Sequence, residues 1–381
     1  MIQIIKTKDE FLGMRDKWNT LLSSMEEPCI FLTWEWVYTW WDFYFSGDSL
    51  CQLFIITVFN GGGQLIGILP AYLKKCRGPL RILYTKLKVL GSEAEAPDYL
   101  DIIAESTNKE IVLSSIFSHL KNPDVVIDFI EINDVRKSSP TIDLLLKISK
   151  EYKNYSKKLS ASACPYLKVP ADYEKYVSSL STKFRFNLRR YTRILMEREG
   201  AKFHEVNRKE ELPNAIEKLF SLHEKRWQDR KDDSVFSNVR RKSFHMKLAP
   251  VFYDSSYLRL FSLSVNSEVV ASLYCFEYKN KIYYYQSGFE PDWSKKSVGV
   301  VLIGKIIEKC IDERKEEFDF LRGKEEYKLK WTGDVRNTYH LEVGLTPKGK
   351  FIFLYKNFIR YVKRKLKRSD ALYWVYKKIH S

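Results

Sequence analysis

Cysteine and histidine are scarce in this sequence and widely scattered. The 381 residues contain six of each. There is no Cys-x-x-Cys pair and no close His/Cys spacing, so we expect no metal site. The first residues, MIQIIKTKDE, lack the apolar stretch of a signal peptide. Dispersed cysteines behind such a start predict a cytoplasmic protein in a reducing compartment.

Long apolar runs are missing as well. No run of about 18 apolar residues occurs, so no membrane-spanning helix is predicted. Hydrophobic residues make up 45% and charged residues 29% of the chain, which is ordinary for a folded globular protein. The length exceeds what one hydrophobic core usually serves, so two domains are predicted.

Acidic residues are nearly absent from one end of the chain. The formal net charge is +16, and residues 348–381 contribute +10 of it, with Asp370 as their single acid. A second basic cluster, KFRFNLRRYTRILMER (183–198), carries six Lys and Arg against one Glu. The rest of the chain is close to neutral. Each of these two helical segments is either a solvated basic face or a site for an anionic partner.

The two halves repeat one order of elements. In the first half, CQLFIITVF (51–59), LIGILPAYLKK and RILYTKLKVLG are followed by a helical pattern around KEIVLSSIFSHLK and the strand VVIDFIEI. In the second half, YLRLFSLSV (257–265), VVASLYCFEYKN and KIYYYQSGF are followed by the helix VGVVLIGKIIEKCIDERK and the strand FDFLRG. Each half therefore reads hairpin, further strand, helix, strand.

An aromatic or amphipathic helix precedes each strand set, FLTWEWVYTWWDFYF (31–45) in the first half and AIEKLFSLHEKRWQDR (215–230) in the second. Small residues and two prolines in LSASACPYLKVP (159–170) indicate a linker. We therefore predict a first domain over 1–160, a second over 170–345 and a basic amphipathic helical tail over 346–381.

Three stretches carry a resemblance to a known family: FLTWEWVYTWWDFY, LHEKRW (222–227), and YYYQSGFEPDWSKKSVGV running on to FDFLRGKEEYKLKW. Together with the repeated order they resemble the GNAT superfamily, and within it the CelD-like acetyltransferases of polysaccharide biosynthesis, which are related to Fem-type peptidyltransferases. The resemblance covers about residues 25–340. It implies an α/β fold with mixed sheets in tandem GNAT-like acyltransferase domains, followed by the basic C-terminal helix.

The resemblance implies acetyl-CoA or another acyl-CoA as co-substrate. GNAT proteins bind its pyrophosphate between the fourth strand and the next helix, where a helix N-terminus offers unpaired N–H groups. In the second half this cofactor-binding turn is Lys295, Lys296, Ser297, Val298 and Gly299. A backbone N–H that meets the developing oxyanion is expected near Gln286, Ser287 and Gly288.

The matching turn of the first half, GSEAEAPDYLD, carries four carboxylates that would repel phosphate. The donor is therefore expected in the second half alone. Neither turn has the Gln/Arg-x-x-Gly-x-Gly/Ala pattern of CoA-binding GNAT proteins, and a solvated loop is the alternative reading of Lys295 and Lys296.

Acyl transfer to an amine needs a proton for the leaving sulfur and a base for the amine. In many GNAT enzymes a tyrosine on the helix after the fifth strand supplies the proton, and here Tyr327 holds that position. Asp98, in a segment that resembles the family, is the expected base or acceptor anchor. Glu290 is the competing base, and a hydrogen-bonded loop carboxylate is the alternative role for Asp98.

Further charged residues are predicted to contact the substrate. Arg226, Arg322 and Lys328 would gather around an anionic group. Asp319 is also predicted at the substrate site, with pairing to Arg322 as its alternative role. Asp101 belongs to the acidic stretch that would receive a cationic amine. His223 lies on the apolar side of its helix, where a structural role competes with substrate contact.

These features predict an N-acyltransferase that acylates an amine, such as an amino sugar or a related precursor of surface polysaccharide. One alternative is a Fem-type aminoacyl-tRNA-dependent peptidyltransferase, with tRNA at the arginine-rich helix. Another is a non-catalytic glycan-binding or scaffold protein with the same fold. The acceptor would be a small molecule or a lipid-linked glycan, and the tail is a candidate for peripheral contact with the inner membrane surface.

Overall fold

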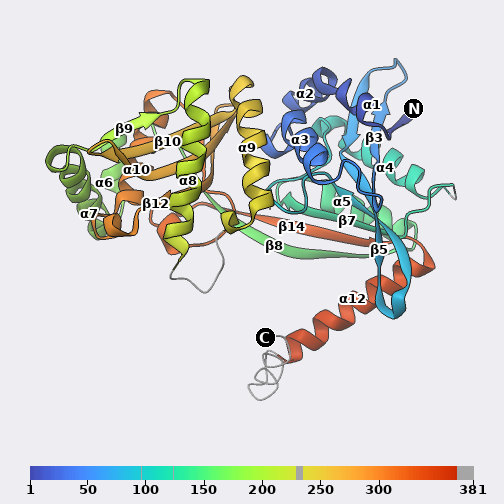
Figure 1. The fold of residues 1–381 in the computed structure, drawn as a ribbon. Coiled ribbons are helices and arrows are strands. Elements are labelled where there is room, and N and C mark those ends of the chain that lie inside the picture. The colour runs from blue at the N-terminus through green and yellow to red at the C-terminus, as the bar shows by residue number, and fades with distance from the viewer. Residues whose placement is uncertain (96, 123, 229–234, 367–381) are drawn as a thin grey trace.

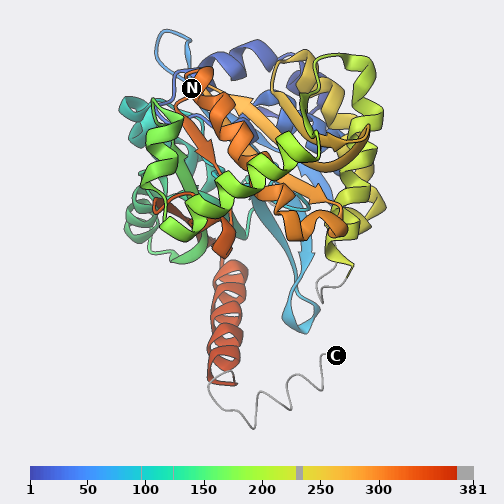
Figure 2. The same ribbon diagram turned by 90° about the vertical axis from the view of Figure 1, so that its left-hand side faces the viewer.

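The computed structural model describes residues 1–95, 97–122, 124–228 and 235–366. Its elements form two halves that share one large sheet (Figures 1 and 2). The helices of the first half are α1 (Lys8–Leu12), α2 (Arg15–Ser23), α3 (Trp34–Tyr44), α4 (Lys109–Leu120) and α5 (Thr141–Glu151). Its strands are β1 (Ile2–Ile5), β2 (Cys51–Leu53), β3 (Ile55–Phe59), β4 (Leu65–Leu69), β5 (Ala71–Arg77), β6 (Leu83–Val89), β7 (Phe129–Arg136) and β8 (Tyr155–Lys168).

The second half adds seven helices and six strands in the described part of the chain. Its helices are α6 (Tyr173–Ser179), α7 (Thr182–Arg193), α8 (Leu212–Trp227), α9 (Val239–Asp254), α10 (Val298–Asp312), α11 (Glu326–Leu329) and α12 (Pro347–Leu366). Its strands are β9 (Lys202–Glu205), β10 (Leu258–Val265), β11 (Glu268–Tyr278), β12 (Lys281–Phe289), β13 (Glu317–Asp319) and β14 (Val335–Gly344). The predicted α/β class with mixed sheets is confirmed.

The large sheet has eleven strands in the order β2-β5-β6-β7-β14-β8-β13-β12-β11-β10-β9, and β1, β3 and β4 form a small separate sheet. Each half contributes one parallel pair, β6 with β7 and β12 with β13. The remaining neighbours in the large sheet are antiparallel. The predicted repeat is therefore visible in the strand pairing as well as in the order of elements.

The halves exchange their last strands. Strand β8, which ends the first half, pairs with β13 of the second, while β14, near the end of the chain, pairs with β7 of the first. β8 and β14 also pair with each other over most of their length. The segment 159–170 was predicted as a linker, and this was wrong, because most of it is the C-terminal part of β8, whose backbone groups are held by two neighbouring strands.

Two apolar layers cover the second-half sheet. On one face, α8 and α9 pack with α3 of the first half in a core that includes Trp36, Phe244 and Phe252. On the other face, α6, α7 and α10 enclose a separate core around Leu188, Ile306 and others. The aromatic segment predicted as a helix is α3, whose Thr33 side chain caps it by accepting a hydrogen bond from the N–H of Trp36 at 3.4 Å.

The C-terminal helix α12 begins on the large sheet and then projects away from the body (Figure 2). Ile352 and Phe353 near its start are buried against the first half. Residues 367–381, which complete the predicted tail, lie outside the described residues. None of the helices in the described ranges has the length and apolar character needed to cross a bilayer.

Candidate active site

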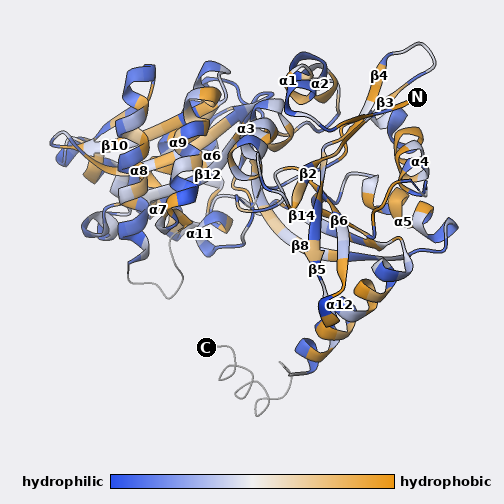
Figure 3. Cartoon of the chain, turned by 45° about the vertical axis from the view of Figure 1, so that its right-hand side comes forward, coloured by the Kyte–Doolittle hydropathy of each residue, from blue (hydrophilic) through white to orange (hydrophobic). Residues whose placement is uncertain are grey.

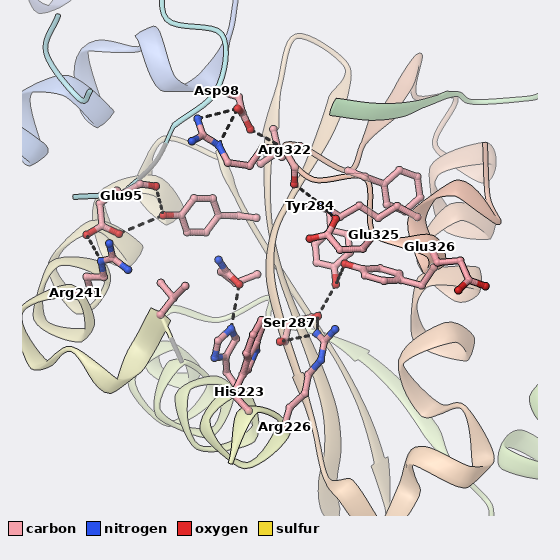
Figure 4. A pocket seen from close by; sticks show the side chains of 18 of the residues that line it. Glu95, Asp98, His223, Arg226, Arg241, Tyr284, Ser287, Arg322, Glu325 and Glu326 are labelled. Atoms are coloured by element: carbon pink, nitrogen blue, oxygen red, sulfur yellow. Dashed lines mark hydrogen bonds and ion pairs between the residues drawn. The ribbon is translucent and has the colours of Figure 1, made fainter. Parts of the chain in front are cut away.

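A cavity of about 590 Å³ lies between the two halves. The first half lines it with the loop that carries Glu95 and Asp98. The second half lines it with the last turns of α8, the end of β12, and the segment from Phe320 to Lys330. Figure 4 shows these side chains converging from three directions. The site is therefore a property of both halves.

Diverging strands open the cavity on the second-half side. β12 and β13 pair in parallel only over Lys281–Tyr283 and Glu317–Asp319. Beyond that point the pairing stops, and Tyr284 on one strand and Phe320 after the other both line the cavity. Past this point the N–H of Phe320 donates to the Pro165 carbonyl and that of Leu321 donates to Oδ1 of Asp319. A backbone donor for a ligand would therefore come from β12.

A β-bulge in β12 determines which side chains meet there. Tyr284 lies opposite Cys275 and Gln286 opposite Tyr274, so Tyr285 is the extra residue. The bulge shifts the alternation of side chains along the strand. As a result Ser287 returns to the side of Tyr284, and their hydroxyl oxygens are 2.5 Å apart.

Tyr327 on α11 extends this pair into a chain of hydroxyl groups. Its hydroxyl donates to that of Tyr284 at 3.3 Å, and Nη1 of Arg226 donates to the hydroxyl of Ser287 at 2.9 Å. Burial, and then the neighbouring Tyr284, raise the pKa of Tyr327 well above its ordinary value. The phenol therefore keeps its proton at neutral pH and is able to donate it.

Arg226 is held over aromatic rings at the same wall. Its guanidinium carbon lies 5.1 Å from the ring centre of Phe289 and 5.9 Å from that of Tyr327. Its Nε is buried and makes no hydrogen bond within the described residues. The predicted substrate residue Arg226 thus lines the cavity with an unused donor.

On the opposite wall, Glu95 is the centre of a buried polar cluster. Its carboxylate accepts hydrogen bonds from the hydroxyls of Tyr44 and Tyr285, the latter at 3.3 Å, and from Nε2 of His245 at 3.1 Å. Arg241 lies 4.0 Å away. Burial raises the pKa of Glu95, but the contacts with His245 and Tyr44 outweigh it and lower that pKa. Glu95 therefore stays ionised, but its side chain is fully buried and both of its oxygens are engaged within this cluster.

The predicted base Asp98 lines the cavity but is fully engaged by Arg322. The backbone N–H of Arg322 donates to Oδ2 at 2.8 Å and its Nε donates to Oδ1 at 3.0 Å. Arg322 also pairs with Asp134 at 3.1 Å, and Nζ of Lys328 donates to the Arg322 carbonyl at 2.6 Å. The alternative prediction was that Arg322 pairs with Asp319, and this was wrong, because Arg322 pairs with Asp98 and Asp134. Asp98, Arg322 and Lys328 therefore hold the cavity wall together.

His223 and Gln286 contact each other at the floor of the cavity. Nε2 of His223 lies 3.2 Å from Oε1 of Gln286, and the His223 ring stacks near Trp227. Burial, and then the positive charge of Arg226, lower the pKa of His223 to about 4. The imidazole is neutral at neutral pH, so it serves as a polar wall group rather than a cation.

Gly288 was predicted among the cofactor residues. In the structure, packing against α8 accounts for a glycine at this position. A Cβ at this position would collide with the backbone of Leu222 and His223 on α8. Only glycine allows α8 to approach β12 this closely. Gly288 is therefore a close-approach residue that lies behind the cavity wall.

The predicted pyrophosphate turn lies at the N-terminus of α10, outside the cavity lining. The N–H of Ser297 donates a hydrogen bond to the Ser294 carbonyl, and Nζ of Lys296 donates to Glu199 at 2.6 Å. Val298 is buried, and Lys295 is exposed. The amides of Val298 and Gly299 open the helix, so they have no acceptor within it.

Three other predicted residues lie away from the cavity. Asp101 accepts hydrogen bonds from Ser139 at 2.6 Å and Thr141 at 2.5 Å, and so anchors the start of α5. Asp319 is fully buried and paired with Arg336 at 3.0 Å. Glu290 pairs with Lys225 at 2.8 Å, beyond the end of β12. None of the three lines the cavity.

The acidic turn of the first half is not a region of unbalanced charge. Glu93 pairs with Lys74 and Lys88, at 2.7 and 2.6 Å. Asp101 likewise pairs with Lys109 at 3.2 Å. With Asp98 on Arg322 and Glu95 on His245, each of the four carboxylates has a partner. The predicted repulsion of phosphate by this turn stays a prediction.

Sequence reasoning missed Glu95 with its partners, and Tyr284. Glu95 stood in the acidic turn, but its direction depends on Ala94, whose φ is +68°. Tyr284 stood in the YYYQSGF segment, where the bulge at Tyr285 leaves no mark in the letters. Within the described ranges no group of His, Cys, Asp and Glu is arranged to hold a metal ion.

Comparison with known proteins finds one family match, which lies in the second half. Residues 182–329 match the family model described as the acetyltransferase (GNAT) domain. The match covers most of the second half and less than half of the whole chain. No curated protein matches the sequence.

Solved structures share this fold over nearly the whole chain. FemX is similar with a TM-score of 0.62 and 11% identity, covering 93% of this chain and 99% of FemX. A conserved protein of unknown function from Bacteroides thetaiotaomicron is similar with a TM-score of 0.55 and 11% identity, over 90% of this chain and all of the other. The C-terminal domain of a putative lysylphosphatidylglycerol synthetase from Agrobacterium fabrum has a TM-score of 0.54 and 9% identity, over 91% and 96%.

Proposed function

We propose that the protein is an N-acyltransferase that moves an acyl group, such as acetyl, from acyl-CoA to an amine held in the cavity between the halves. One observation carries this proposal. The strands β12 and β13 diverge directly into the cavity, beside the protonated phenol of Tyr327. That arrangement combines an opening between two strands, a proton donor and an enclosed space.

The donor would approach from the second half. α10 begins shortly after β12 ends, so its N-terminal amides lie at the same end of β12 as Ser287. The amides of Val298 and Gly299 would bind the pyrophosphate, while Lys295 adds positive charge. An extended acyl-pantetheine arm would then reach the divergence of β12 and β13 and present its carbonyl there.

The acceptor would approach from the first half. Glu95 keeps a buried negative charge behind this wall, which would attract a cationic amine, and Arg226 and Arg241 offer guanidinium groups to an anion on the same molecule. This combination favours an amine that also carries phosphate or carboxylate, such as an amino sugar precursor of surface polysaccharide. The same acceptor class follows from the resemblance to CelD-like acetyltransferases.

The proposed reaction forms a C–N bond and breaks a C–S bond. The bound amine first loses a proton to solvent, because only its neutral form has a lone pair for attack. Its nitrogen then attacks the thioester carbonyl and becomes cationic, and its N–H proton also passes to solvent in the cavity. The thiolate that leaves takes its proton from the hydroxyl of Tyr327. The Tyr327 proton is then restored from solvent through Tyr284 and Ser287, which link it to the cavity.

A second candidate, aminoacyl-tRNA-dependent peptidyl transfer, is favoured by one feature of α7. A groove of about 620 Å³ runs along this helix and is lined by five arginines. Among the described residues no carboxylate pairs with Arg190, Arg193 or Arg198, so their charges are available to phosphates. FemX shares the fold, and a shared fold does not favour either of the two functions over the other.

Thermal unfolding with ligands separates the candidates. Under the acyl-CoA proposal, free CoA and acetyl-CoA at a hundred times the dissociation constant would each stabilise the protein by about 2.7 kcal/mol. The double variant Arg190→Glu/Arg193→Glu serves as a control that leaves this stabilisation intact. No shift with any CoA thioester, combined with salt-sensitive binding of charged tRNA that the double variant loses, would overturn the acyl-CoA proposal in favour of peptidyl transfer.

A further inference from the structure

Helix α12 has an inner side that is tied to the first half. Ile352 and Phe353 are buried, Lys356 pairs with Glu131 at 3.2 Å, and Arg360 donates to Glu342 at 2.5 Å. These contacts fix the direction in which the helix leaves the body. In Figures 1 and 3 it extends away from the sheet, and its later turns touch no other described element in the views.

The outer side of α12 carries an exposed apolar stripe. Its members are Phe351, Leu354, Tyr355, Phe358 and Tyr361, each between 41% and 61% exposed. They follow one another at intervals of three, one, three and three residues, which places all five on one face of the helix. Globular proteins rarely leave a contiguous stripe of this kind uncovered.

Basic residues border the stripe. α12 contains no Asp or Glu. Lys350, Lys363, Arg364 and Lys365 have no carboxylate partner within the described residues, and Nζ of Lys365 lies 5.5 Å from the ring centre of Tyr361. The exposed face is therefore apolar along its middle and positive at its margins.

Segments beside α12 also combine exposed apolar side chains with basic side chains. The tip of the β5–β6 hairpin exposes Leu80 and Leu83 together with Arg77 and Arg81. It lies beside the start of α12, because Nζ of Lys348 donates to the Leu83 carbonyl at 3.3 Å.

On another flank, an open hollow of about 690 Å³ is lined by Lys150, Lys153, Tyr155, Phe353 and Leu354. We call the α12 stripe, the hairpin tip and this hollow the α12 surface.

We propose that the α12 surface binds the surface of an anionic lipid bilayer, with the apolar stripe at the level of the headgroups and the Lys and Arg side chains on the lipid phosphates. An amphipathic helix with aromatic residues on one side and Lys and Arg on the other has this physical preference. A second copy of the chain is a poorer occupant, because its matching surface would bring like charges together.

The cavity and α12 are related through the direction of α8. In Figure 1 the C-terminal end of α8, whose last turns line the cavity, points to the same side of the molecule as α12. A lipid-linked acceptor would then reach the cavity from the bilayer surface. The membrane proposal stands without this link, because it rests on α12 and its neighbours alone.

Vesicle flotation of the full chain tests the proposal. We expect the protein to float with vesicles of equal parts phosphatidylcholine and phosphatidylglycerol, and about tenfold less with phosphatidylcholine alone, since anionic lipid contributes about 1 kcal/mol per nearby basic residue. Phe358→Glu should reduce binding to the anionic vesicles about tenfold or more, because it replaces an aromatic ring that would enter the headgroup layer by a charge that the anionic lipids repel. Hydrogen exchange of α12 amides should slow when the vesicles are added.

Phe186→Glu is the matched control, because Phe186 is 63% exposed and Phe358 is 61% exposed. The control should float like the unaltered protein, and both variants should melt at the unaltered temperature. The proposal is overturned if Phe358→Glu floats normally, if Phe186→Glu loses binding equally, or if no vesicle binds. It is also overturned if gel filtration shows a dimer that only Phe358→Glu dissociates.

Discussion

Arg322 binds the carboxylate of Asp98 with its backbone and with its side chain at once. Its N–H lies 2.8 Å from Oδ2 and its Nε lies 3.0 Å from Oδ1. Asp98 belongs to the first half and Arg322 follows β13 of the second. This pair therefore fixes the two walls of the cavity relative to each other, and Asp98 acts as a positioning residue.

Replacing Asp98 by Ala should lower the free energy of unfolding by about 2 kcal/mol, because it leaves the backbone N–H and Nε of Arg322 without their acceptor, which costs about 1–3 kcal/mol for a buried polar group. Arg322 keeps its contact with Asp134, which limits the loss. Urea denaturation at neutral pH measures the change. Asp143→Ala, at an exposed pair with Lys158, should change stability by less than about 0.5 kcal/mol. Equal stabilities of the two variants would contradict the positioning role.

Asp98 also gives stability a particular pH dependence. Burial, and also the negative charge of Asp134, raise its pKa from 3.8 to about 6, against the opposing effect of Arg322. The native carboxyl therefore binds its proton more tightly than the unfolded one. The Asp98 contribution to stability is present below the unfolded pKa and is lost as the pH rises through about 6. Asp98→Asn should lack this decline, as judged by urea denaturation across the interval.

His223 should give stability a pH dependence opposite to that of Asp98. Its pKa is lowered from 6.5 to about 4, so the native protein binds fewer protons than the unfolded chain between these values. Stability is therefore lost as the pH falls through this window. His223→Gln should remove about 2 kcal/mol of that loss between neutral pH and about pH 4.5. His119→Gln on α4 is the control and should follow the unaltered protein; identical pH profiles for all three would contradict the assignment.

Gly288→Ala should be strongly destabilising because the added methyl group meets the backbone of α8. Overpacking of this kind costs about 1–3 kcal/mol. Gly61→Ala, at a position with nothing within 4 Å of the new atom, provides the comparison. Thermal unfolding of both proteins should give a lowered midpoint for the first variant alone, and a normal midpoint for Gly288→Ala would show that α8 can move aside.

Much of the fold was predictable because the spacing of apolar residues along the chain indicates helices and strands. The 31–45 segment predicted α3, the Val298–Asp312 stretch predicted α10, and the repeated order predicted the duplicated parallel pairs. The exchange of β8 and β14 was not predictable in the same way. Strand pairing joins residues far apart in the chain, and the small residues and prolines of 159–170 resemble a linker until a partner strand is known.

The candidate site was predictable in part for a related reason. Tyr327, Arg226 and Gln286 line the cavity because their elements were assigned correctly. Glu95 was passed over in favour of Asp98, since several carboxylates stand in one short turn and only its backbone conformation decides which faces the second half. Packing around Gly288 and the ion pair of Lys296 with Glu199 are likewise long-range contacts that spacing along the chain does not encode.

Glu95→Gln should raise the KM for the amine acceptor by about tenfold to a hundredfold, since it removes the charge that receives a cationic amine while keeping the hydrogen-bonding shape. Stabilisation by free CoA should be unchanged because the donor lies on the other wall. Steady-state kinetics with both substrates varied separates the two effects. An unchanged acceptor KM with weakened CoA binding would place the acceptor elsewhere.

Tyr327→Phe should lower kcat by about a hundredfold or more, because the departing thiolate loses its proton donor. Binding of acetyl-CoA, measured by thermal unfolding, should stay within a factor of about two, since the ring remains beneath Arg226. The decisive measurement uses a thioester whose thiol is a much stronger acid than that of CoA. Its thiolate leaves without a proton, so the difference between Tyr327→Phe and the unaltered enzyme should shrink to a few-fold. Tyr253→Phe, whose hydroxyl bonds the Asn207 carbonyl at 2.6 Å, should leave both rates unchanged. If the Tyr327→Phe defect were equally large with the acidic thiol, the hydroxyl would act in placing the substrate, and if neither protein turned over while both bound CoA, the fold would serve binding alone.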